Sequence, residues 1–140
     1  MRLFIAIQLN EELRQQVTEI QNQFRRQKVR GNYSRPENLH VTLAFLGEYG
    51  DPDAVLEAME RASFAPFTVT MDQVGCFGDL WWTGLSESRE LEKLAKDLRK
   101  ALADAVIPYD RKKFKAHVTF LRRPEYGDGQ RAPQVQVTSC

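Results

Sequence analysis

Two stretches of the chain place apolar residues at helical spacing, three or four positions apart. The first predicts an amphipathic helix that begins after an N-cap at Asn10 and ends near residues 27–31. The second predicts a helix over about 87–105, closed by Pro108. The two apolar stripes consist of Leu13, Val17, Ile20 and Phe24, and of Leu91, Leu94, Leu98, Leu102 and Val106.

Shorter runs rich in β-branched and aromatic residues predict strands over 2–9, 39–46, 66–74, 80–85 and 115–122. A glycine-bearing turn is expected at 75–78, and a short helix is expected after Asp51-Pro52, with Val55, Leu56 and Met59 as its apolar residues. The turn-rich segment 124–133 leaves only 134–138 for a final strand. Each half of the chain thus carries a strand, a long helix and a second strand, which suggests two similar lobes that face one another.

The tripeptide His-Val-Thr occurs twice, at 40–42 and 117–119, and its histidines are the only two in the chain. In a strand, residues i and i+2 lie on one face and residue i+1 on the other. Each predicted strand therefore buries its valine and presents an imidazole beside a hydroxyl. One such pair is commonly structural, but packing does not require both histidines to be placed alike, so the repetition favours a paired chemical role.

Length and composition fit one globular domain spanning residues 1–140, because 42% of the residues are hydrophobic and 28% charged. No apolar run approaches the roughly 20 residues of a membrane span. The apolar start at residues 3–7 lacks a signal-peptide cleavage site, so we expect a cytoplasmic protein with no membrane contact. Cys76 and Cys140 form no metal-ligand or disulfide pattern, and we expect neither a metal nor a cofactor.

Basic residues gather near both histidines although the net charge is only +1. Segments 22–40 and 109–123 hold 11 of the 20 basic residues and 2 of the 19 acidic ones. Charge runs are usually solvated surface. Their position beside both His-Val-Thr motifs nevertheless favours an anionic substrate, while the small net charge argues against bulk coating of nucleic acid.

Paired imidazoles suit the hydrolysis of a phosphodiester. In-line displacement places the attacking and leaving oxygens on opposite sides of phosphorus, so one histidine takes a proton from water while the other protonates the leaving oxygen. An imidazole pKa near 6.5 serves both tasks near neutral pH. The threonine hydroxyls and a nearby arginine would donate hydrogen bonds to the non-bridging oxygens. The residues alone do not say which histidine is the acid.

The segments Arg-Pro-Glu-Asn-Leu-His-Val-Thr-Leu-Ala-Phe-Leu-Gly (35–47) and Phe-Lys-Ala-His-Val-Thr-Phe-Leu-Arg (114–122) carry a resemblance. With the opening strand and helix, they resemble the two-histidine (2H) phosphoesterase superfamily, most closely the bacterial RNA 2',3'-cyclic phosphodiesterases, or 2'-5' RNA ligase-like proteins. The resemblance implies an α+β, bilobal and pseudo-symmetric fold, with antiparallel sheets flanked by helices around a central cleft. Members commonly continue beyond the second motif, so this chain is expected to be C-terminally short.

The family implies hydrolysis of RNA 2',3'-cyclic phosphate ends to 2'-phosphates. Carried over by position, His40 is the proton donor, His117 the proton acceptor, and Thr42 and Thr119 bind phosphate. Arg122, five residues after the second histidine, is expected to clamp the oxyanion. The partner would be an RNA or nucleotide with a 2',3'-cyclic phosphate end, bound by a monomer.

Other readings remain open at this point. The same site could act on a small cyclic nucleotide, on an ADP-ribose cyclic phosphate or on a 2'-5' linkage, in the ligase or the hydrolase direction. A binding protein for RNA ends with little turnover would keep the basic segments but tolerate loss of either histidine. For base stacking we favour Tyr33, in the basic loop; of Trp81 and Trp82, one should be core and the other exposed.

Overall fold

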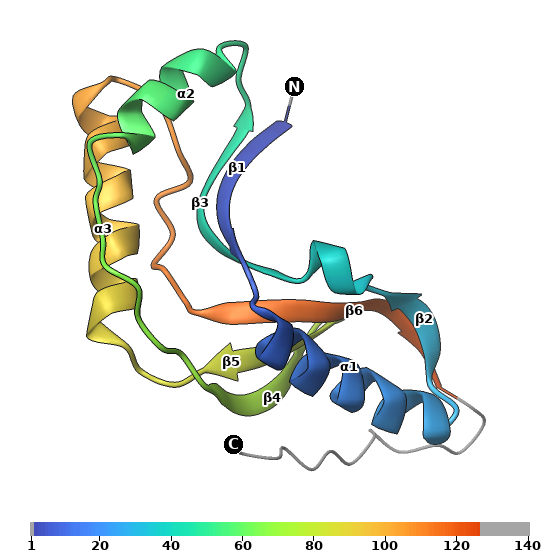
Figure 1. Ribbon diagram of the computed structural model, residues 1–140. Coiled ribbons are helices and arrows are strands. Elements are labelled where there is room, and N and C mark those ends of the chain that lie inside the picture. Colours follow the sequence, from blue (N-terminus) through green and yellow to red (C-terminus); the bar gives the residue numbers. More distant parts are fainter. Residues whose placement is uncertain (1, 127–140) are drawn as a thin grey trace. The chain divides into compact units, whose positions relative to one another are not determined.

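The computed structural model describes residues 2–126, which form an α+β fold with two sheets, as the sequence predicts (Figure 1). A two-stranded sheet has the order β1-β3, and a four-stranded antiparallel sheet has the order β2-β6-β5-β4. The elements are β1 (Arg2–Gln8), α1 (Glu11–Arg26), β2 (Arg30–Tyr33), the 3-10 helix η1 (Pro36–Asn38), β3 (His40–Glu48), α2 (Pro52–Met59), β4 (Met71–Phe77), β5 (Leu80–Leu85), α3 (Arg89–Asp104) and β6 (His117–Glu125). The final strand predicted over 134–138 lies outside the described residues.

The chain divides into two compact units, each assembled from three separate segments. Within the described residues, the first unit comprises 2–7, Thr42–Val69 and Glu87–Ala116, and the second comprises Gln8–Val41, Thr70–Ser86 and 117–126. The units therefore do not coincide with the two halves of the sequence, because each half contributes segments to both.

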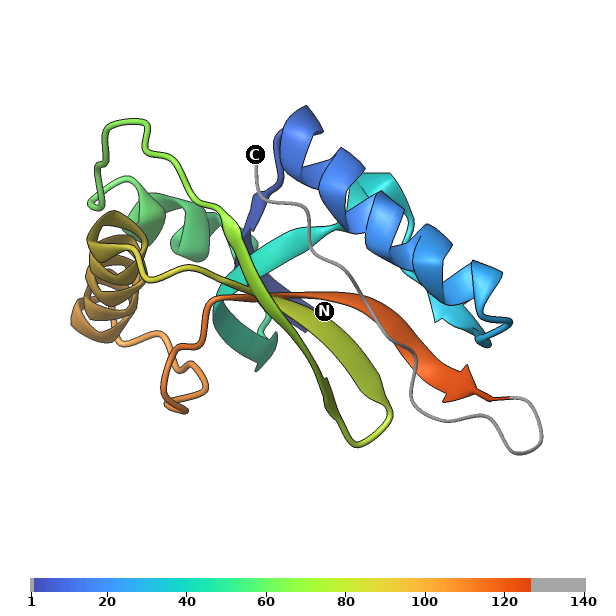
Figure 2. The same ribbon diagram turned by 90° about the horizontal axis from the view of Figure 1, so that it is seen from below.

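The second unit is built on α1, which covers one face of the four-stranded sheet (Figures 1 and 2). All four residues of the predicted stripe of α1 are buried, and Gln21 is buried beside them. Phe24 makes edge-to-face contacts with Trp81 and Phe120, with ring centroids 5.0 and 5.2 Å apart. These aromatic contacts tie the helix to β5 and β6.

The N-cap predicted at Asn10 is present, and its side-chain oxygen accepts a hydrogen bond from the Leu13 N–H at 2.9 Å. We expect Asn10→Ala to lower the free energy of unfolding by about 1 kcal/mol, since an N–H of the first turn loses its partner. Urea unfolding followed by circular dichroism measures this loss. Asn10→Asp should retain most of the stability, because aspartate caps equally well.

The first unit packs α2 against α3, whose predicted stripe is buried at its four leucines. Two positions of the predicted stripes are wrong. Val106 is 86% exposed, because α3 ends at Asp104 and Val106 turns left-handed at φ +59°, which brings Ile107 into the core instead. Leu56 is 57% exposed, since in this short helix Ala58 takes the buried place beside Val55.

The β4–β5 hairpin turns later than the sequence suggests. The turn is Gly78-Asp79, with Gly78 at φ +61°, and Phe77 pairs with Leu80 across it. Residues 75–77, expected in the turn, instead extend β4, and residues 66–70 precede the strand. β6 likewise runs through Pro124 to Glu125, which pairs with Arg30, so the turn-rich reading of the segment was wrong at its start.

Candidate active site

The two His-Val-Thr motifs open the strands β3 and β6, which show the same order of buried and open positions over their first six residues. Val41 and Val118 are 2% and 0% exposed, whereas the flanking histidines and threonines are half-buried. The predicted alternation is therefore confirmed in both strands. Each strand buries its valine and presents an imidazole and a hydroxyl on the opposite face.

A bulge in β6 changes the face on which Arg122 lies. Trp82 pairs with Thr119 and Trp81 with Leu121, so Phe120 is an extra residue in the ladder. Phe120 and Leu121 are both fully buried, and the next residue, Arg122, is exposed. Without the bulge, a spacing of five would put Arg122 on the face opposite His117. With it, Arg122 lies on the same face as His117 and Thr119.

The side chain of Gln21 contacts the bulge from the face of the sheet that α1 covers. Its amide Nε2 donates to the carbonyl oxygen of Phe120 at 2.9 Å and to that of Ser34 at 2.8 Å. Ser34 completes the junction, because its own N–H donates to the Phe120 oxygen at 3.0 Å. Gln21 is only 2% exposed, and its bond to Phe120 is buried, whereas its bond to Ser34 is part-buried. Sequence analysis missed Gln21, although a polar residue four positions after Val17 and three before Phe24 interrupts the apolar stripe.

The ring of His40 is oriented by the chain just before it. Its Nδ1 lies 2.6 Å from the carbonyl oxygen of Asn38 in η1. A carbonyl oxygen can only accept, so Nδ1 carries the hydrogen in this contact. In Figures 1 and 2 the chain from η1 to the start of β3 runs alongside β6, and both segments belong to the second unit.

The second unit contains five of the six predicted site residues. Thr42 belongs to the first unit, because β3 passes from one unit to the other between Val41 and Thr42. The residues that the second unit holds are His40, His117, Thr119, Arg122 and Tyr33.

Tyr33 is engaged on the helix side of the second unit. Its hydroxyl donates to the Val29 carbonyl at 2.7 Å, and the Arg25 guanidinium lies 4.3 Å from its ring centroid. Burial raises the pKa of Tyr33, against the opposing effect of Arg25, so the phenol stays neutral around pH 7. Base stacking by Tyr33 stays a prediction. The aromatic residue in ring contact with His117 is Trp82, at a centroid distance of 6.3 Å.

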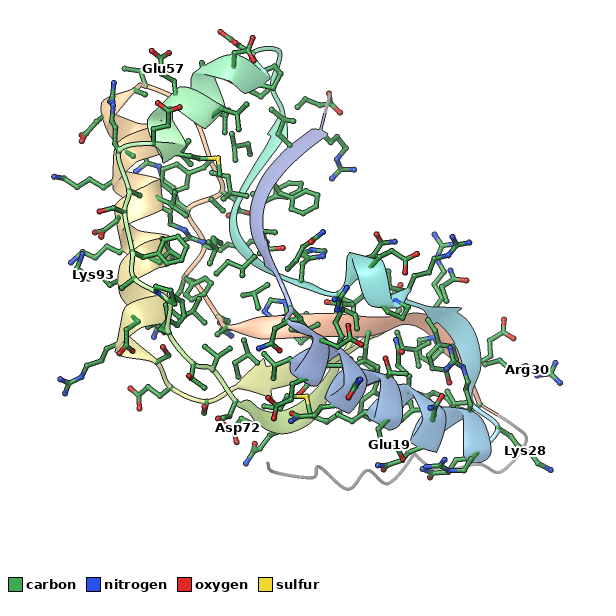
Figure 3. The ribbon with its side chains drawn as sticks, in the orientation of Figure 1. Glu19, Lys28, Arg30, Glu57, Asp72 and Lys93 are labelled. Carbon is green, nitrogen blue, oxygen red and sulfur yellow. The ribbon has the colours of Figure 1, made fainter. Side chains whose placement is uncertain are left out.

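The basic residues of the two segments 22–40 and 109–123 are divided between the two units. Arg26 pairs with Glu19 at 2.8 Å. Lys28 and Arg30 point outward at the far end of α1 and β2 (Figure 3). Arg122 and Arg123 belong to the second unit, whereas the basic residues of 111–115 belong to the first.

Potential metal ligands are scattered over the described part of the chain. Within residues 2–126, His, Cys, Asp and Glu side chains do not gather in threes or larger groups that could hold a metal ion. None of the described helices is both long and apolar enough to cross a membrane.

Comparison with known proteins identifies the family. The sequence model of a family described as LigT-like phosphoesterases matches residues 7–80. An RNA 2',3'-cyclic phosphodiesterase of Archaeoglobus fulgidus is 34% identical, over 91% of this chain and 78% of the relative. The chain belongs to the LigT-like phosphoesterase family. The resemblance to two-histidine phosphoesterases is thereby confirmed, and so is the fold class that it implied.

Further LigT-like relatives agree in sequence and in structure. The RNA 2',3'-cyclic phosphodiesterase of Thermotoga maritima is 32% identical, over 91% of this chain and 73% of the relative. The crystal structure of TT0787 from Thermus thermophilus superposes with a TM-score of 0.76 at 30% identity, covering 100% of this chain and 81% of that one. Escherichia coli LigT complexed with 3'-AMP gives a TM-score of 0.74 at 31% identity, covering 94% and 78%.

Proposed function

We propose that this protein hydrolyses 2',3'-cyclic phosphate ends of RNA to 2'-phosphates. The observation that carries the proposal is the pair of matching His-Val-Thr strands, each with its valine buried and its imidazole and hydroxyl on the open face. The names of the relatives support the substrate, since those of Archaeoglobus fulgidus and Thermotoga maritima are RNA 2',3'-cyclic phosphodiesterases. We further propose that it acts as a cytoplasmic monomer and needs no metal.

The reaction balances with the residues of the two strands. A water oxygen attacks phosphorus and gives its proton to His117, while the bond from phosphorus to O3' breaks and O3' takes a proton from His40. The products are a 2'-phosphate and a 3'-hydroxyl, with the proton exchanged between the two imidazoles. The resemblance to the family assigns His40 as acid and His117 as base. The Asn38 contact at His40 Nδ1 fits a proton transfer at Nε2.

Thr42, Thr119 and Arg122 would bind the phosphate. Hydroxyl and guanidinium donors aimed at the non-bridging oxygens stabilise the negative charge that grows there as water attacks. The β6 bulge supports this role for Arg122, because it sets the guanidinium-bearing position on the face of His117 and Thr119.

The test is product analysis on an RNA oligonucleotide that ends in a 2',3'-cyclic phosphate. The proposal expects a 2'-phosphate as the product, separated from the 3'-phosphate isomer by chromatography against standards. Formation of the 3'-phosphate would contradict the assigned direction of cleavage. Tight binding of the oligonucleotide with no product would favour an RNA-end binding protein. A panel with small cyclic nucleotides and an ADP-ribose cyclic phosphate then ranks substrates by kcat/KM.

Arg122→Ala should lower kcat/KM for the cyclic-phosphate end by about 10- to 100-fold, which corresponds to the roughly 1.5–3 kcal/mol of a hydrogen bond to a charged group. Arg122→Lys should recover only part of this loss, because an ammonium cannot donate in the same forked geometry. Steady-state kinetics measures both effects. Arg30→Ala, at the outward-pointing end of β2, is the matched control and should change kcat/KM less than threefold. An equal effect of both alanines would indicate general electrostatic attraction rather than a clamp.

A further inference from the structure

Trp82 stands next to His117 on the open face of the four-stranded sheet. In the ladder Trp82 pairs with Thr119, and the neighbouring Gly84 pairs with His117. The indole and imidazole centroids are 6.3 Å apart, with the ring planes inclined by 72°. Trp82 is half-buried, so part of its indole remains accessible.

Gly75 makes room for the indole. Gly75 pairs with Trp82 across the β4–β5 ladder, and a Cβ added to Gly75 would lie 2.5 Å from the indole Cζ2 and 2.6 Å from Cη2. Non-bonded carbon atoms do not approach one another this closely, so only glycine fits at position 75. The six-membered ring of the indole therefore lies directly over the Gly75 backbone. A Cβ at Gly84 would lie 3.6 Å from Cζ3, an ordinary contact, so the close approach is specific to Gly75. One face of the indole thus packs against the sheet, and the other face points away from the sheet.

We propose that Trp82 is the platform on which the nucleobase of the terminal nucleotide stacks, an inference that rests on the proposed function. One ribose carries both the base and the 2',3'-cyclic phosphate. A base on the Trp82 indole therefore keeps the phosphate within reach of the neighbouring His117. Stacking uses the π-face that every base has, so this contact would bind RNA ends of any sequence.

The other aromatic candidates of the second unit are committed to different contacts. Trp81 is only 8% exposed, packs edge-to-face on Phe24, and donates from Nε1 to the Tyr126 hydroxyl at 2.8 Å. The ring of Tyr33 lies under Arg25, and its hydroxyl is bonded to the Val29 carbonyl. Trp82 combines an accessible indole with contact to His117.

The test compares two substrates in Trp82→Leu and Trp82→Phe. One substrate is adenosine 2',3'-cyclic phosphate, and the other is methyl riboside 2',3'-cyclic phosphate, which has no base. Trp82→Leu should raise KM for the nucleotide by about 5- to 150-fold, the equivalent of one base–aromatic stack. Its kcat should change little, and Trp82→Phe should restore most of the affinity. Kinetic constants for the base-free substrate should stay within about threefold of the parent protein in both variants.

Gly75→Ala provides an independent variant, because its methyl group displaces the indole without removing it. It should reproduce the selective rise in KM for the nucleotide. Gly50→Ala is the matched control, since a Cβ at Gly50 meets nothing within 4 Å, and it should leave both substrates unaffected. If Trp82→Leu raises KM equally for both substrates, Trp82 acts by positioning His117 or stabilising the sheet, and the stacking proposal is overturned.

A direct binding measurement separates this proposal from the proposed activity. The sequence has only two tryptophans, so Trp81→Phe leaves Trp82 as the single tryptophan, which can be excited selectively over the four tyrosines. Adenosine 2'-phosphate should quench its emission, whereas ribose 2-phosphate should not. This result would support stacking even if the protein hydrolysed neither substrate. Binding of adenosine 2'-phosphate with no change in Trp82 emission, and with the same Kd in Trp82→Leu by calorimetry, would overturn it.

Discussion

Replacing either His40 or His117 with alanine should lower kcat for hydrolysis of the cyclic-phosphate end by about 10²- to 10⁴-fold. Each variant removes one of the two proton transfers, so the attacking water or the leaving O3' must react without a partner. Binding should largely survive, because the proposed phosphate ligands Thr42, Thr119 and Arg122 are unchanged in both variants. Stopped assays for kcat and calorimetry with the 2'-phosphate product measure the two effects separately.

The losses in kcat of the two single variants should not combine. In the proposed mechanism both histidines serve a single step, so the double variant is expected to be about as slow as the slower single variant. Glu57→Ala, a change at an exposed position on α2, is the control for effects of mutation and purification, and it should keep full activity. Hydrolysis within tenfold of the parent rate in either single histidine variant would contradict the paired mechanism.

Gln21→Met should lower the stability of the fold. Methionine fills a similar volume but cannot donate, so the Ser34 carbonyl loses the Gln21 bond and Phe120 keeps only the bond from Ser34. The loss of hydrogen-bond partners at this buried and part-buried junction costs about 1–3 kcal/mol. The free energy of unfolding should fall by that amount, which corresponds to a drop in Tm of roughly 2–4 °C per kcal/mol. Calorimetry and urea unfolding measure it.

The Gln21 bonds also hold the β6 bulge, so Gln21→Met should lower kcat in protein that is still fully folded. Gln15→Met is the matched control: it makes the same change on the exposed side of α1 and should stay within about 0.5 kcal/mol of the parent. If Gln21→Met is as stable and as active as Gln15→Met, the bulge does not depend on Gln21.

The repeating patterns of the sequence predicted much of this fold, because they reflect periods set by the backbone. The apolar stripe of α1 and the buried valines of both histidine strands follow directly from periods of 3.6 and 2, and the N-cap at Asn10 follows from the capping ability of the asparagine side chain. Val106 failed because α3 ends before it, where the period stops applying, and Leu56 failed because the buried face of the short helix α2 consists of Val55 and Ala58.

Features that break a period were not predictable in the same way. The bulge at Phe120 is a property of the ladder between β5 and β6, and the face of Arg122 depends on it. Gly75 looked like a turn residue, yet it lies in β4 beneath Trp82, because the reason for the glycine comes from a different strand. The role of Gln21 depends on hydrogen bonds to the carbonyls of Ser34 and Phe120, and Phe120 is 99 residues away in the sequence.

The central claim, that two imidazoles perform the acid and base steps without a metal, is tested most directly by the rate of cyclic-phosphate opening in excess EDTA. The account predicts that the purified protein forms 2'-phosphate at the same rate in EDTA as in buffer without chelator, and that added Mg²⁺ or Mn²⁺ does not increase it. A rate that collapses in EDTA and returns when a divalent cation is restored would contradict the account.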